Sequence, residues 1–159
     1  MHLPAAVQKA RGLLEDVTPL ALDCGRFCAA ACCQGDDETG MLLFPGEETL
    51  YEACDFGEVM EAEYALAGRP ARLFVCRGTC PRASRPLACR LFPLLPRLKD
   101  GAASVAMDHR AACVCPLHSS GVQGLSPAFV QAAQEAAEAL LADPACRAWL
   151  QDLWGTMAL

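Results

Sequence analysis

The sequence predicts an α+β fold, in which short β-hairpins and cysteine-containing loops pack against helices at the two ends of the chain. Apolar residues recur at helical spacing near both termini, which indicates amphipathic helices there. The middle of the chain instead holds short β-type runs separated by glycine-containing turns. The chain has 159 residues, a length that fits one domain over residues 1–159.

The first expected helix begins near Pro4, because proline is favoured in the first turn of a helix. Its buried stripe would consist of Val7, Ala10, Leu14 and Val17. Thr18 and Pro19 should end it, since a residue that precedes proline disfavours the helical conformation.

For the middle of the chain, the sequence predicts a short strand, one further helix and two hairpins. A short buried strand over 41–44 would lead into a helix from Pro45 across 46–56, on which Cys54 would face the core. Strands over 58–66 and 71–76 would be joined at 67–70, where Gly68 can take a positive φ. Strands over 91–98 and 104–108 would be closed by the turn Lys99-Asp100-Gly101.

The C-terminal region, 126–155, predicts two packing helices. Ser126-Pro127 and Asp143-Pro144 each combine an N-cap residue with a first-turn proline. Gly155 should end the second helix. The expected buried residues of the two helices are Phe129, Ala133, Ala136, Leu140, Cys146, Trp149, Leu150, Leu153 and Trp154.

Eleven cysteines are the most informative feature of the sequence. Four of them lie within ten residues, namely Cys24, Cys28, Cys32 and Cys33. Thiolates are soft metal ligands, and short spacings let one loop present several of them to a common centre. The adjacent Cys32 and Cys33 leave the backbone in different directions and could serve two centres. Disulfides and buried, hydrophobic thiols are the alternatives.

A second group of thiols follows in a proline-rich stretch that should be a stiff loop rather than a helix. Cys76 and Cys80 repeat the spacing of Cys24 and Cys28, and Cys89 comes next. Either Cys113 or Cys115 could complete this set.

Two arginines, Arg85 and Arg90, flank Cys89. We interpret them either as donors to sulfur or to nearby carbonyls, or as ordinary solvated arginines.

Charge and hydropathy indicate which partners and which cellular locations the sequence disfavours. The net charge of -6 argues against nucleic-acid and membrane-surface partners. The first 17 residues lack the apolar core of a secretory signal, and the uncharged run over 111–134 is broken by proline and glycine. We therefore expect a cytoplasmic protein without a membrane span, in which reduced thiols point to metal rather than to disulfides.

These cysteines resemble the CxxCxxCC, or YkgJ-like, cysteine-cluster family, which is described as zinc- or iron-chelating. The resemblance covers about 24–116 and rests on the vicinal Cys32-Cys33 pair, Cys76 and Cys80, the run Arg85-Pro86-Leu-Ala-Cys89-Arg90-Leu-Phe-Pro93, and Cys115-Pro116. The first gaps are three residues here, where the name of the family implies two. The resemblance implies a metal-binding domain and no particular reaction.

Eight candidate thiolates suffice for two four-cysteine centres, with Cys113 as an alternative ligand. The first hypothesis is zinc in closed sites with a structural or chelating role. The alternative is an iron-sulfur cluster for electron transfer or as a component of a radical or modification enzyme. Metal delivery, through exchangeable binding, is a further alternative.

The sequence presents no catalytic constellation, so we predict neither catalytic residues nor an organic cofactor site. A thiol enzyme in which His109 or His118 activates a cysteine is the weakest hypothesis. The sequence leaves a protein partner and the oligomeric state open.

Overall fold

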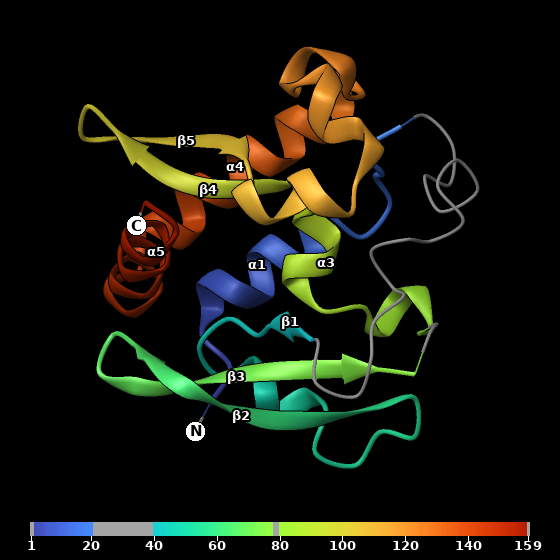
Figure 1. Ribbon diagram of the computed structural model, residues 1–159, viewed down its shortest axis with the longest axis vertical. Coiled ribbons are helices and arrows are strands. Elements are labelled where there is room, and N and C mark those ends of the chain that lie inside the picture. The colour runs from blue at the N-terminus through green and yellow to red at the C-terminus, as the bar shows by residue number, and fades with distance from the viewer. Residues whose placement is uncertain (1, 21–39, 78–79, 159) are drawn as a thin grey trace.

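The computed structural model describes residues 2–20, 40–77 and 80–158 and has the predicted α+β fold (Figure 1). The predicted ligands Cys24, Cys28, Cys32 and Cys33 lie outside these residues. The elements are α1 (Ala5–Leu13), β1 (Met41–Leu42), β2 (Gly57–Leu66), β3 (Arg69–Cys76), α3 (Leu87–Leu91), β4 (Leu94–Lys99), β5 (Ala102–Met107), α4 (Pro127–Ala142) and α5 (Pro144–Met157). Five short 3-10 helices accompany them within the described residues: η2 (Glu47–Leu50), η3 (Arg82–Ser84), η4 (His109–Cys113), η5 (Pro116–Ser120) and η6 (Val122–Gly124).

Two antiparallel sheets occur in the part of the chain that the structure describes. One has the strand order β1-β3-β2, and the other is the β4-β5 hairpin. α3 contacts both β1 and β4, and Figure 1 shows it between the two sheets. Both predicted hairpins are confirmed, but the strand expected from Leu91 begins only at Leu94, because Leu91 belongs to α3. Their turns, Ala67-Gly68 and Asp100-Gly101, have positive φ at both residues, as tight two-residue hairpin turns require.

One main core joins the two ends of the chain. Most residues of the predicted stripes are buried, and Val7, Ala10, Phe129, Ala133, Ala136 and Leu140 are all fully enclosed. Val17 and Trp154, which were also predicted, are only partly buried. α4 packs against α1 and against the β4-β5 hairpin. A smaller cluster, formed by Leu43, Tyr51 and Phe74, lies under the three-stranded sheet, and Cys54 packs against it as expected.

No helix among residues 2–20, 40–77 and 80–158 is long and apolar enough to cross a membrane.

The helix expected over 46–56 is wrong. Gly46 has a left-handed φ of 82°, and only the short η2 follows it. The reason lies in Glu47, which is not a solvated first-turn acid but a fully buried side chain that accepts a hydrogen bond from the backbone N–H of Phe44. A carboxylate bound to the chain three residues earlier closes a tight turn instead of starting a helix.

Two helix boundaries also differ from the predictions, and one helix occurs where none was predicted. α1 ends at Leu13, before Pro19, and Gly12 in its last turn has low helix propensity. α3 occurs within the stretch expected to be a loop, because Pro86 takes the N-cap position, where its missing N–H costs no hydrogen bond. α5 continues through Gly155 to Met157.

Cys146 lies in the core at 0% exposure, as predicted. Burial and then the charge of Asp143 raise the pKa of its thiol to about 12. Because this pKa is raised, only about one thiol in 10,000 is the reactive thiolate at pH 8. We expect iodoacetamide at pH 8 to leave Cys146 unmodified in the native protein and to alkylate it after denaturation, as measured by peptide mass spectrometry. Native labelling as fast as that of the exposed Cys113 would contradict this burial.

Candidate functional site

One cavity brings two of the predicted metal ligands together. Cys89 of α3 and Cys115, which directly precedes η5, both line it. The residues that follow α1 form another part of its wall, including Val17 and Pro19. Its volume is about 50 Å³, whereas one water molecule needs about 10–15 Å³, so it has room for a few water molecules or an ion.

α3 places Cys89 at this cavity. Leu87 and Leu91 lie one turn apart on the same helix face, and both are fully buried in the main core. Cys89 lies midway between them and is only partly buried. The burial of the two leucines therefore orients the helix and leaves the thiol at the cavity wall.

Two consecutive 3-10 helices place Cys115. Asp108 caps η4 by accepting a hydrogen bond from the backbone N–H of Arg110 at 2.9 Å. The backbone N–H of Cys115 donates to the carbonyl of the fully buried Ala111 at 2.8 Å. Cys113 lies in η4, is exposed, and is not among the residues that line the cavity. The fold thus distinguishes two cysteines that the sequence leaves equivalent.

The cavity wall is rich in positive charge. Arg82, Arg85 and Arg90 line it, and Glu15 is the acidic residue among the described lining residues. Cations beside a thiolate site offset the negative charge that accumulates when several thiolates gather. The wall is therefore electrostatically suited to ionised sulfur ligands.

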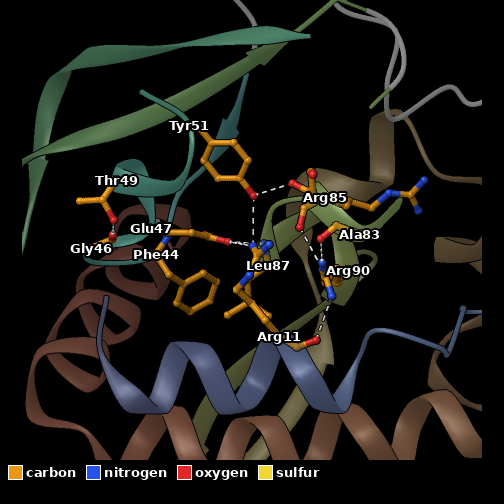
Figure 2. Close-up of polar contacts among 11 residues, drawn as sticks. Arg11, Phe44, Gly46, Glu47, Thr49, Tyr51, Ala83, Arg85, Leu87 and Arg90 are labelled. Atoms are coloured by element: carbon orange, nitrogen blue, oxygen red, sulfur yellow. Dashed lines mark hydrogen bonds and ion pairs between the residues drawn. The ribbon is translucent and has the colours of Figure 1, made fainter. Parts of the chain in front are cut away.

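A buried polar network holds the turn that leads into α3, the helix that carries Cys89 (Figure 2). The carboxylate of Glu47 forms an ion pair with Arg11 of α1 and accepts a hydrogen bond from the backbone N–H of Leu87 at 2.7 Å. The hydroxyl of Tyr51 accepts from Arg11 at 3.1 Å and donates to the carbonyl of Ser84 at 2.8 Å. This network joins α1, η2 and the turn that leads into α3.

Arg90 completes the network from the other side of the turn (Figure 2). It is only 8% exposed, and its guanidinium donates to the carbonyls of Arg85 at 2.9 Å, Ala83 at 2.8 Å and Arg11 at 2.9 Å. Of the two interpretations of Arg90, the structure supports hydrogen bonding to nearby carbonyls and excludes an ordinary solvated arginine.

Burial and charge shift the pKa values within this network. Burial raises the pKa of the Glu47 carboxyl, against the opposing effects of the Leu87 N–H and of Arg11. Burial lowers the pKa of Arg11, but Glu47 and Tyr51 outweigh it, so that the pKa is raised and the guanidinium stays charged. Burial also raises the pKa of Tyr51, and Glu47 and the more distant Cys89 act in the same direction. The network is thus within electrostatic reach of the Cys89 thiol.

Among the predicted ligands that the structure describes, Cys76 and Cys80 are not brought to this cavity. Cys76 ends β3 opposite Gly57 and packs beside the small cluster of Leu43, Tyr51 and Phe74. Cys80 precedes η3, and neither it nor Cys76 is among the lining residues. Within 2–20, 40–77 and 80–158, no three His, Cys, Asp or Glu side chains are grouped as they would be around one metal ion.

The two histidines of the thiol-enzyme hypothesis also lie outside the cavity lining. The ring of His109 packs edge-on against Trp154, with centroids 5.3 Å apart.

Sequence reasoning missed Arg11, Glu47 and Tyr51. The signal for Arg11 was its position four residues after Val7, which places it at the edge of the apolar stripe of α1. The buried state of Glu47 had no local signal, because its partners at Arg11 and Leu87 are far away in the sequence.

The described chain is thus a small α+β protein with two thiols in the wall of one arginine-lined cavity. Comparison with known proteins adds no relative, because no family model, no curated protein and no solved structure matches this chain. The resemblance to the YkgJ-like family therefore stays a prediction from the sequence.

Proposed function

We propose that this chain is a zinc-binding protein that holds the metal in cysteine-thiolate sites with a structural or chelating role. One observation carries the proposal: Cys89 and Cys115, distant in the sequence, line the same ion-sized cavity. Sulfur ligands of this kind suit zinc, and the arginines around them would offset the charge of a thiolate complex.

The cavity also supports Cys115, rather than Cys113, as the last ligand in the sequence. Cys115 reaches the cavity from a backbone fixed by its hydrogen bond to Ala111, whereas Cys113 is exposed. Tetrahedral zinc requires ligand atoms at fixed distances around one point. An exposed side chain outside the cavity is a poorer candidate for such a position.

The remaining ligands are proposed from the sequence, namely Cys24, Cys28, Cys32, Cys33, Cys76 and Cys80. The first four lie outside the described residues. They follow soon after a segment of the cavity wall in the chain. Pro19 lines the cavity, and Cys24 follows Leu20 by four residues. The backbone N–H of Ser126, at the start of α4, donates to the carbonyl of Pro19 at 2.7 Å and fixes this entry point.

A four-thiolate zinc site has no open coordination position, which favours a structural or chelating role over catalysis. The proposal includes a cytoplasmic location, where thiols remain reduced. It agrees with what the sequence resemblance to the zinc- or iron-chelating YkgJ-like family implies.

Elemental analysis of protein purified without oxygen, with a visible spectrum and a sulfide assay, tests the proposal. We expect colourless protein with about two zinc ions per chain, because eight thiolates fill two four-coordinate sites. Iron with equimolar sulfide would contradict the zinc proposal and support the iron-sulfur alternative. Protein that holds neither metal, even after refolding with zinc under reducing conditions, would contradict the proposed function.

A further inference from the structure

The turn that carries Cys89 has little stability of its own. α3 spans only five residues, and isolated helices of this length do not form in water. The preceding residues form η3, which is a single short turn. The direction of the Cys89 side chain therefore depends on whatever fixes residues 83–90 from outside.

Two buried side chains from outside this segment, Glu47 and Tyr51, supply that fixation, and Arg90 within the segment adds hydrogen bonds to it (Figure 2). Glu47 accepts from the backbone N–H of Leu87, two residues before Cys89. Tyr51 donates to the carbonyl of Ser84, and Arg90 donates to those of Ala83 and Arg85. The main-chain groups in these hydrogen bonds lie between Ala83 and Leu87, just before Cys89.

The same network is connected to the part of the cavity wall that directly follows α1. Arg11 pairs with Glu47 through its side chain and accepts from Arg90 through its carbonyl. Arg11 belongs to α1, and the chain just after α1 lines the cavity at Leu14 and Val17. The network therefore sets the position of Cys89 relative to this wall.

A buried ion pair adds little net stability to a core, because the loss of hydration opposes the attraction between the charges. Apolar residues of similar size often stabilise as well or better. What the polar network adds is direction, since each hydrogen bond fixes one backbone group at one distance and angle.

We propose that Glu47, Tyr51, Arg11 and Arg90 are positioning residues of the thiolate site, which hold the Cys89 turn against α1 so that the thiol faces the cavity before a metal binds. This inference rests on the proposed function. None of the four acts as a ligand in it. They act on metal affinity through the geometry of Cys89, as hydrogen-bonding groups behind metal ligands do.

The test uses the full chain, reduced and free of oxygen, in the variants Glu47→Gln and Arg90→Gln. The zinc dissociation constant is measured by competition with a chromophoric chelator of known affinity, and amide hydrogen exchange of residues 83–91 is measured in the metal-free chain. We expect zinc binding to weaken about 10- to 100-fold and the amides of Leu87 and Arg90 to exchange faster. Leu140→Ala, in the buried face of α4 and outside the cavity lining, is the control for a general loss of stability.

Tyr51→Phe gives a milder second variant in case Glu47→Gln does not fold, because it removes only the hydroxyl that binds Ser84 and Arg11. Wild-type protein that binds no zinc would overturn the proposed function and this inference together. Wild-type protein that binds zinc no more tightly than the folded network variants would overturn the inference alone. The inference would also be overturned if Leu140→Ala weakened zinc binding as much as they do.

Discussion

Replacing Cys115 with serine is expected to remove about one of the two zinc ions proposed per chain. The serine hydroxyl stays protonated at neutral pH and is a poor zinc ligand, while its size leaves the backbone hydrogen bond to Ala111 in place. The same loss is expected for Cys89→Ser, because both thiols line the same cavity. Zinc content by elemental analysis, together with the temperature of unfolding with and without chelator, measures the effect.

Cys113→Ser is the matched control, since it makes the same chemical change two residues away at an exposed position. We expect this variant to keep its full zinc content. Loss of zinc from Cys113→Ser with retention in Cys115→Ser would reverse the assignment of the last ligand. Full zinc content in both Cys89→Ser and Cys115→Ser would exclude this cavity as the metal site.

Replacing Phe44 with alanine is expected to lower the free energy of unfolding by about 3–5 kcal/mol, the range for truncating a fully buried aromatic ring. Phe44 is fully buried, and its ring centroid lies 4.6 Å from that of Trp149 in α5. The substitution opens a cavity between the C-terminal helix and the segment that leads into η2. Urea denaturation followed by circular dichroism measures the loss.

Leu50→Ala is the comparison for this prediction, because Leu50 belongs to η2 in the same segment but is 45% exposed. Exposed substitutions of this kind change stability by about 0.5 kcal/mol or less. If both variants lost the same free energy of unfolding, the burial of the Phe44 ring would not explain its contribution to stability.

Local chemistry explains which features could be predicted from the sequence. The turn Asp100-Gly101 closes its hairpin because its residues tolerate the positive φ that a two-residue turn needs. The helix after Ser126 could be predicted because Pro127 suits a first turn and the apolar stripe follows at helical spacing. These signals lie within a few residues of the structure that they determine.

Local sequence patterns therefore predicted the fold class, the hairpins and the terminal packing helices, and they identified Cys89 and Cys115 as candidate ligands. Long-range packing then brings these two thiols to one cavity and leaves Cys113 out of its lining. It also decided that Glu47 is buried beside Arg11 instead of starting a helix. The physical reason is the same in each case: the partners are far apart in the sequence, and no local spacing records which distant groups will compensate a buried charge or complete a cavity wall.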